Sequence, residues 1–308
     1  MKKLFITLLT SIALTAMSQP IEVVVPYSTG GPVDILGRAI TRYLNDTESE
    51  AITVNRPGAD GRIGMKYAVQ KGAEAPTVVA AATGPALFNQ VLYANPGYAT
   101  ADFDWIVPIL RAPVAIMVSN NSGINNLQDF INRGRTGKLN CGVSNSSGQF
   151  AGRYFVDHLK FADTQLVPYK GTNDLLLAVV SNNIECGIDV VTTFKPQHSD
   201  NRLKIIAMGS VAADADFARI PLFSSVIPGY SHYNWYGAAV PKSVAPAKRE
   251  LLVRRLKQMH LDPTFRTTIG HLSFELIAPP ADSDRFIQTE FRKFDGLRER
   301  LGIAKLND

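Results

Sequence analysis

The sequence is poor in the side-chain arrangements that carry enzyme and metal chemistry. Its five histidines are scattered without the paired spacing of a metal motif, and two cysteines without supporting histidines make a poor metal site. The pattern glycine-x-serine-x-glycine is missing, because Gly142-Val143-Ser144-Asn145-Ser146 fails at its last position. Gly58, Gly61 and Gly64 lack the spacing of a dinucleotide fingerprint. We therefore expect no metal and no cofactor, and an enzyme only if its site is of an unfamiliar kind.

The chain also lacks a strong charge of either sign. It has 32 lysines and arginines against 27 aspartates and glutamates, a net charge of +5, and the charges are interspersed. No basic stripe with interleaved aromatic residues is present, so we expect no nucleic-acid partner. The balance indicates at most a mild attraction for anions.

Long apolar runs are absent after the first residues. Lys2 and Lys3 precede an apolar stretch over residues 4–16, which is too short to span a bilayer comfortably, and small residues follow at Ala16-Met17-Ser18. This pattern predicts a cleavable signal peptide over residues 1–18. No cysteine lies near the cleavage point, so we expect no lipid anchor. The mature product should be soluble and exported.

The two cysteines lie in segments that we expect to be strands. Cys141 falls within residues 139–143 and Cys186 within residues 185–190. If the two strands are neighbours, the sulfur atoms can form a disulfide, which an oxidising compartment permits. Two buried free thiols are the alternative.

Short apolar strands alternate with helical patterns along the chain. This order predicts an α/β fold in which a mostly parallel sheet is flanked by helices on both faces. The strands are expected at residues 21–26, 51–55, 77–82, 138–143, 165–169 and 185–190, and the helices at 33–44, after Gly61, at 149–160, 173–180, 246–260 and 283–301.

Two extended segments divide this pattern into two α/β lobes. Residues 105–118 form a long extended stretch that passes from one lobe to the other, and residues 227–235 return. We assign residues 19–115 plus 233–308 to lobe 1 and residues 116–232 to lobe 2. Two crossings between two lobes imply a hinge and a cleft between them.

The run Val23-Val24-Val25-Pro26-Tyr27-Ser28-Thr29-Gly30-Gly31-Pro32-Val33-Asp34 is the most informative segment. An apolar strand leads into a glycine-bearing turn, and Pro32 stands where a helix can begin. Unpaired N–H groups and the positive end of the helix dipole would favour a carboxylate or phosphate there. The alternative is an ordinary strand-turn-helix connection.

The other strand ends are also rich in hydroxyl groups and glycines, which suits hydrogen bonding to a small polar ligand. In open α/β sheets ligands bind beyond the carboxyl ends of the strands. The candidate ligand-binding residues are Tyr27, Ser28, Thr29, Gly30, Gly31, Asp34, Thr83 and Gly84 in lobe 1, and Ser144, Ser146, Ser147, Tyr169, Lys170 and Asp189 in lobe 2.

Each candidate also has a purely structural interpretation. Gly30 and Gly31 suit a turn with positive φ, and Asp34 suits the first turn of a helix or a bond to its own loop. Thr83 and one of the three serines can cap helices. Lys170 can be solvated. An acidic residue in an apolar strand such as Asp189 needs a partner, either an ammonium or hydroxyl of the ligand or a loop amide.

Spaced motifs over nearly the whole mature chain give a family resemblance. The chain resembles the extracytoplasmic solute receptors of tripartite tricarboxylate transporters, the Bug receptors. The motifs are Val25-Pro26-Tyr27 with Gly30-Gly31 and Asp34, Val54-Asn55-Arg56-Pro57-Gly58-Ala59 with Gly61 and Gly64, Asp102-Phe103, Val167-Pro168-Tyr169-Lys170-Gly171, and Trp235-Tyr236-Gly237.

The resemblance implies a two-lobed periplasmic-binding-protein fold of type II-like topology. Such a receptor closes on a small organic acid, whose carboxylate is held by backbone N–H groups and water without an arginine clamp, and delivers it to membrane permease subunits. Thr29 stands where the family usually has proline, and its hydroxyl either donates to the ligand or caps the helix. The identity of the acid does not transfer from the family.

We therefore interpret the chain as a monomeric periplasmic solute-binding protein for a small carboxylate. The alternative is a sensor that presents the bound solute to the outer domain of a sensor kinase. Both need the same cleft, so the sequence does not separate them.

Overall fold

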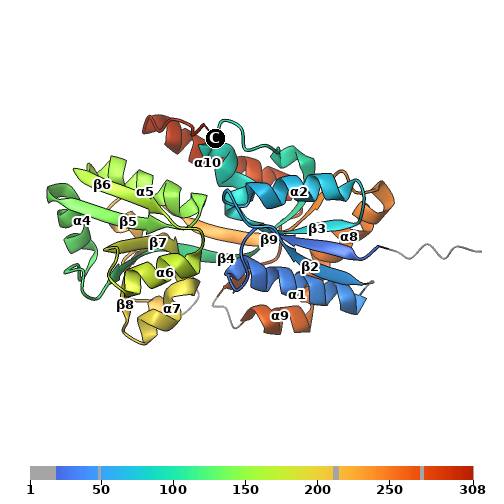
Figure 1. The fold of residues 1–308 in the computed structure, drawn as a ribbon, viewed down its shortest axis with the longest axis horizontal. Helices are drawn as coiled ribbons and strands as arrows, with labels where there is room; N and C mark the ends of the chain where they lie inside the picture. The colour runs from blue at the N-terminus through green and yellow to red at the C-terminus, as the bar shows by residue number, and fades with distance from the viewer. Residues whose placement is uncertain (1–18, 48–49, 211–214, 271–273, 308) are drawn as a thin grey trace, which may run out of the picture.

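The computed structural model describes residues 19–47, 50–210, 215–270 and 274–307 of the chain. They form two α/β lobes that lie side by side and are joined by strands running through the middle of the molecule (Figure 1). The two-lobed fold is the one predicted. The proposed signal peptide and its cleavage point lie outside the described residues.

Lobe 1 begins with three parallel strands and the helices that connect them. The elements are β1 (Ile21–Val25), α1 (Pro32–Thr47), β2 (Ala51–Asn55), α2 (Arg62–Gly72) and β3 (Thr77–Ala82). The strand order is β2-β1-β3, and β1 pairs in parallel with both neighbours. Parallel pairing brings the carboxyl ends of the three strands to one edge of the sheet.

The predicted crossing over residues 105–118 lies within one long strand, whereas the predicted return over residues 227–235 is strand only from Tyr233 onward. In β4 (Phe103–Ser119) the first part pairs with β9 (Tyr233–Pro241) and with β10 (Glu275–Leu276), whereas the last part pairs with β7 and β8 of lobe 2. All these pairs are antiparallel, as is the pairing of β3 with β9. One strand thus belongs to the sheets of both lobes, which makes the crossing a continuous hydrogen-bonded connection.

Lobe 2 repeats the parallel arrangement around three predicted strands. Its elements are α4 (Leu127–Thr136), β5 (Lys138–Val143), α5 (Ser146–Leu159), β6 (Asp163–Pro168), α6 (Thr172–Val180), β7 (Cys186–Val190), α7 (Val191–Ser199) and β8 (Leu203–Met208). β5 pairs in parallel with β6 and β7. The prediction did not include α4, α7 or β8.

The C-terminal helices pack on lobe 1, and the last of them extends across the join between the lobes. They are α8 (Pro246–Gln258), α9 (Pro263–Gly270) and α10 (Ser283–Arg300). On α10, Phe294 packs against Phe88 and Phe150, with ring centroids 4.8 and 5.2 Å apart. Short turns complete the fold: a π-helix (Gly84–Phe88), α3 (Asn89–Leu92), and 3₁₀ turns at Thr100–Asp102, Ala215–Phe217, Phe223–Ser225 and Met259–Leu261.

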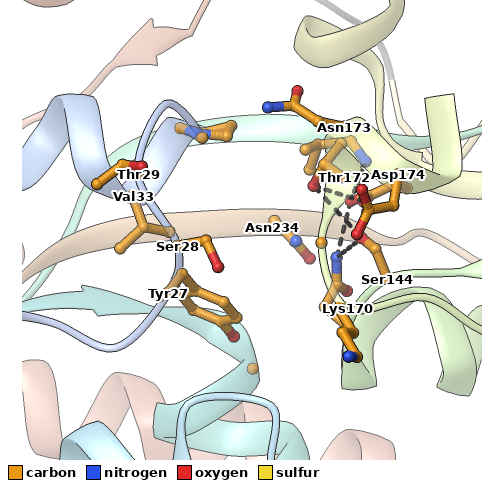
Figure 2. A pocket seen from close by; sticks show the side chains of 18 of the residues that line it. Tyr27, Ser28, Thr29, Val33, Ser144, Lys170, Thr172, Asn173, Asp174 and Asn234 are labelled. Atoms are coloured by element: carbon orange, nitrogen blue, oxygen red, sulfur yellow. Dashed lines mark hydrogen bonds between the residues drawn. The ribbon is translucent and has the colours of Figure 1, made fainter. Parts of the chain in front are cut away.

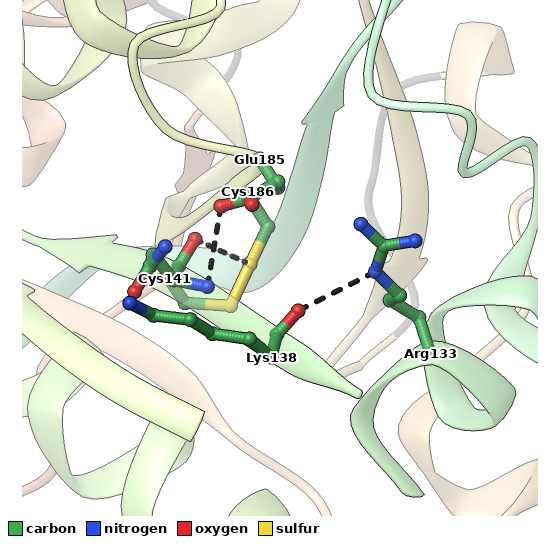
Figure 3. The surroundings of a disulfide bond; sticks show 6 residues. Arg133, Lys138, Cys141, Glu185 and Cys186 are labelled. Carbon is green, nitrogen blue, oxygen red and sulfur yellow. Dashed lines mark hydrogen bonds between the residues drawn. A yellow bond between two sulfur atoms is a disulfide. The ribbon is translucent and has the colours of Figure 1, made fainter. Parts of the chain in front are cut away.

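The two cysteines form a disulfide in the structure. Cys141 of β5 and Cys186 of β7 are register partners in neighbouring strands, with Cα atoms 4.6 Å apart. Figure 3 shows the bond beside Glu185, whose carboxylate accepts a hydrogen bond from the Asn140 N–H at 3.2 Å. Of the two alternatives left open by the sequence, the structure has the bonded pair.

The described residues include no helix that is long and apolar enough to cross a membrane.

Candidate functional site: the cleft between the lobes

A cavity of about 280 Å³ lies where the strand ends of the two lobes face each other. Figure 2 shows Tyr27, Ser28 and Thr29 on one side, Ser144, Lys170 and Thr172 on the other, and Asn234 between them. The predicted residues that line this cavity are Tyr27, Ser28, Thr29, Gly31, Gly84, Ser144, Lys170 and Asp189.

The conformation of the turn between β1 and α1 is fixed by hydrogen bonds to an acidic side chain. Asp34 accepts hydrogen bonds from the Gly30 N–H at 3.0 Å, from Arg38 Nε at 2.9 Å and from Asn55 Nδ2 at 2.8 Å. Burial alone would raise the pKa of Asp34, but these bonds outweigh it and lower the pKa. Gly30 has φ +86°, a left-handed conformation that glycine adopts without strain. Asp34 and Gly30 do not line the cavity; their hydrogen bond fixes the shape of the turn, and their ligand contact stays a prediction.

The same turn leaves main-chain donors for a ligand. The N–H groups of Ser28, Thr29 and Gly31 donate no hydrogen bond to any of the described residues. They stand at the amino end of the 16-residue helix α1, where the dipole favours a negative charge. A Cβ added to Gly31 would meet no atom within 4 Å, so the backbone here borders open space.

On the opposite side, a buried carboxylate holds two loops of lobe 2 together. Asp189 accepts hydrogen bonds from Asn145 Nδ2 at 2.8 Å, Thr172 Oγ1 at 3.1 Å, the Val190 N–H at 2.7 Å and the Ser144 hydroxyl. Burial raises the pKa of Asp189, and these hydrogen bonds oppose the increase. Since four protein donors occupy both oxygens, Asp189 positions the loops that line the cavity, which is the second of the two roles predicted for it.

Two further candidates are structural. The Thr83 hydroxyl donates to the Trp235 carbonyl at 2.8 Å and accepts from the Trp235 N–H at 2.6 Å, which fixes β3 against β9. Ser147 contacts Asn234 Oδ1 and, at 2.9 Å, His232 Nε2. Thr83 is 1% exposed and Ser147 is fully buried, and neither lines the cavity. These bonds show a structural role for Thr83 and Ser147, and their ligand contact stays a prediction.

A second cavity, of about 620 Å³, continues from the first. The two share Tyr27, Ser28, Ser144, Asn145 and Lys170, and the second is also lined by the predicted residues Ser146 and Tyr169. All fourteen predicted residues therefore lie in or directly behind one continuous cleft. The side chains in contact with it come from both lobes.

The sequence interpretation missed several residues that line the cleft. Thr172 and Asn173 lie within four positions of the predicted strand end at Tyr169. Thr172 falls in the polar segment expected at that strand end but was not among the candidate binding residues, and Asn173 is the next position. Asn234 lies in the crossing strand β9, where no local signal marks it. The most important omission is Asp60, in the loop before α2, which lines the second cavity.

Asp60 links the two lobes. Its Oδ1 accepts a hydrogen bond from the Tyr27 hydroxyl at 3.0 Å, and its Oδ2 accepts one from the Ser146 N–H, at the amino end of α5, at 2.8 Å. Loss of water raises the pKa of Asp60 to about 6 against the effect of these bonds, and the charge of Asp189 adds to the increase. Among the described residues, no group of three or more histidine, cysteine, aspartate and glutamate side chains is placed to hold a metal ion.

The family follows from a comparison of the sequence with known protein families. A family model described as the tripartite tricarboxylate transporter family receptor matches residues 40–303. The chain belongs to this family. It is a family of solute-binding receptors rather than of enzymes, and its members are periplasmic binding proteins.

Individual relatives are distant in sequence but similar over their whole length. Protein BugT of Bordetella pertussis is 21% identical over 302 residues, which cover 95% of this chain and 92% of BugT. A solved structure of R. palustris Rpa4515 with adipate has a TM-score of 0.83 and 22% identity, and covers 95% of this chain and 100% of that one. The periplasmic binding protein BugD has a TM-score of 0.81 and 21% identity, with 93% and 99% coverage. These structures establish the shared fold.

Proposed function

We propose that this receptor captures a small organic carboxylate in the cleft between its lobes and delivers it to membrane permease subunits of a tripartite tricarboxylate-type transporter. The observation that carries the proposal is the set of unpaired N–H groups of Ser28, Thr29 and Gly31, which border an interlobe cavity at the amino end of α1. The adipate bound to the related R. palustris protein supports a carboxylate as the ligand.

Different residues around the cavity would bind different parts of the ligand. The main-chain N–H groups and the α1 dipole bind one carboxylate, and the exposed Lys170 adds a mobile positive charge at the other lobe. The hydroxyl and amide groups of Ser144, Thr172 and Asn173 are available to the rest of the ligand. Ligand contacts on both lobes favour the closed form, which is the form that a permease would recognise.

The remaining parts of the proposal are those of an exported receptor. We take residues 1–18 as a signal peptide, the periplasm as the location, and a monomer as the working form. We place the lobe boundaries at 115/116 and 232/233, within and just before the strands that β4 and β9 contribute to the join. No observation favours the sensor-kinase partner over the transporter, so we do not develop it.

Calorimetric titration of the mature protein with a panel of carboxylic acids tests the proposal. The panel contains monocarboxylates, dicarboxylates and ω-amino acids. We expect Gly31→Val to fold, because the added side chain would enter open space. We also expect it to abolish binding, because the side chain would fill the space beside the main-chain N–H groups that bind the carboxylate. The matched control is Gly296→Val in α10, where an added Cβ would meet only the Arg300 guanidinium, at 3.9 Å.

Two results would contradict the proposal. One is a wild-type protein that binds no acid of the panel. The other is a Gly31→Val variant that binds as tightly as the Gly296→Val control, since the ligand would then lie elsewhere.

A further inference from the structure

We propose that Asp60 makes this receptor selective for acids that have a single carboxylate and a hydrogen-bond donor at the opposite end, and that it excludes dicarboxylates. This inference rests on the function proposed above, and it specifies the class of acid.

The backbone of the loop before α2 presents Asp60 to the cleft. Ala59 and Asp60 have φ values of 48° and 49°, in the left-handed region that non-glycine residues seldom adopt. The Asn89 side chain donates to the Asp60 carbonyl at 3.0 Å and fixes the loop from behind. The backbone of Asp60 is therefore fixed by its loop, and hydrogen bonds from the Tyr27 hydroxyl and the Ser146 N–H hold its carboxylate.

The carboxylate lies where the two cavities meet. A Cβ placed on Gly84, which lines the first cavity, would be 3.5 Å from Asp60 Oδ2, and Asp60 itself lines the second cavity. The same point would be 2.9 Å from the Tyr27 hydroxyl oxygen. A ligand whose carboxylate is bound at the α1 turn would extend past Tyr27 toward Asp60.

The amino end of α5 is already occupied by an anion of the protein itself. The Ser146 N–H, the first of that helix, donates to Asp60 Oδ2. A second ligand carboxylate would thus compete with Asp60 for this donor and meet a like charge. Among the described residues that line the two cavities, Lys170 is the only cation, and it is exposed.

Asp60 also has acceptor capacity to offer a ligand. A carboxylate accepts about four hydrogen bonds. The Tyr27 hydroxyl, the Ser146 N–H and the Ser146 hydroxyl are the protein partners of Asp60, so acceptor capacity remains, whereas Asp189 is fully occupied. An ammonium, amide or hydroxyl group at the far end of the ligand would use this remaining capacity. Charge and hydrogen bonding therefore favour the same class of ligand.

The test compares two series of acids that differ only at one end. The first series is 3-aminopropionate, 4-aminobutyrate and 5-aminopentanoate, and the second is succinate, glutarate and adipate, which have the same numbers of methylene groups. We expect the wild-type protein at neutral pH to bind the best ω-amino acid at least about tenfold more tightly than its dicarboxylate partner.

Two variants remove the charge of Asp60. Asp60→Asn keeps the shape of the side chain, and its amide oxygen can still accept a hydrogen bond from Tyr27 or Ser146. Asp60→Gly suits the left-handed backbone, so at least one of the two variants should fold normally. Both variants should lose or reverse the preference. The control is Asp163→Asn, which removes an exposed carboxylate at the opposite end of β6 from the cleft and should retain the preference.

A pH series on the wild-type protein and on the Asp60→Asn variant provides a second measurement. Protonation of Asp60 near pH 6 should strengthen binding of the dicarboxylates as the pH falls from about 7.5 to about 5. Tyr27 and Tyr98 also face Asp60, but burial raises the pKa of each, so both stay neutral. Asp174, Asp189 and Lys170 are the other charged side chains that line the two cavities, and the dicarboxylate itself takes up a proton in this pH range. The Asp60→Asn variant separates these effects from that of Asp60.

The possible outcomes are distinguishable. Dicarboxylates that bind the wild type as tightly as the ω-amino acids, with no change in Asp60→Asn, would overturn the inference and leave the proposed function intact. If the Asp60 variants lose affinity equally for both series, Asp60 only stabilises the contact between the lobes, and the inference would be overturned as well. A wild-type protein that binds neither series, nor any other acid of the panel, would refute the proposed function itself.

Discussion

Replacement of Asp189 by alanine should destabilise the protein, even though Asp189 lines the cavity between the lobes. The substitution leaves four donors without their acceptor: the Ser144 and Thr172 hydroxyls, the Asn145 amide and the Val190 N–H. These donors belong to separate segments of lobe 2, which follow β5, β6 and β7. If Asp189 instead served only as a ligand contact, its removal would affect affinity and leave the unfolding free energy unchanged.

The magnitude depends on which donors can turn to water. Val190 is 2% exposed, so leaving its N–H without an acceptor lowers the unfolding free energy by about 1–3 kcal/mol. The three side-chain donors line the cavity or its border and can be hydrated, so each of those bonds contributes only about 0.5–1 kcal/mol. Removing a buried carboxylate also relieves its own desolvation, which offsets part of the loss. We expect a net destabilisation of about 3 kcal/mol, which most folded domains survive.

Urea denaturation of ligand-free wild type, Asp189→Ala and Asp189→Asn measures this loss. The asparagine variant keeps one oxygen acceptor, so it should fall between the other two. Ligand affinity of Asp189→Ala should fall as well, because the loops that carry Ser144 and Thr172 are no longer fixed. A loss of unfolding free energy below about 1 kcal/mol in Asp189→Ala, together with weakened binding, would refute the loop-organising role.

Two further predictions concern stability. Replacing Cys141 and Cys186 by alanine removes a disulfide with a sequence separation of 45, and the urea midpoint should fall by the equivalent of about 4 kcal/mol, while an unchanged midpoint would contradict the bond. Burial lowers the pKa of His232 to about 3, so the stability contributed by its neutral ring is complete above about pH 6.5 and is lost as the pH falls toward 3. The unfolding free energy of His232→Gln should therefore decline less steeply than that of the wild type over this range, and parallel declines would refute the assignment.

The parts of the fold that the sequence predicted well are those where a local pattern decides the structure. The strands over residues 51–55, 77–82 and 138–143 have the predicted bounds, because a short run of strand-forming residues between turn residues has few other conformations. The helix α7 was missed because a proline, Pro196, lies inside it, and this residue usually argues against a helix. Tertiary packing overrides local propensity there.

The site was predictable in outline but not in its division of roles. The sequence indicates that Thr83 and Ser147 lie at strand ends, but not that their hydroxyls bond to residues 152 and 87 positions away. Asp60 lies in a glycine-rich loop that would be interpreted as a simple turn. Its function depends on Ser146, 86 positions further along the chain and in the other lobe. Contacts of that kind become visible only when the lobes are placed against each other.

The arrangement separates the source of affinity from the source of selectivity. In the proposed site, the N–H groups of Ser28, Thr29 and Gly31 would bind any carboxylate alike, because main-chain donors do not depend on side-chain identity. Selectivity must then come from the far end of the cleft, where Asp60 is held by its own loop and by the other lobe. A substitution of Asp60 would change which group the ligand can have at its far end. It would not disturb the turn between β1 and α1 proposed to bind the carboxylate at the near end. On this reasoning, receptors with the same turn can differ in their ligands through single residues of the loop before α2, and Asp60→Gly is the direct test in this chain.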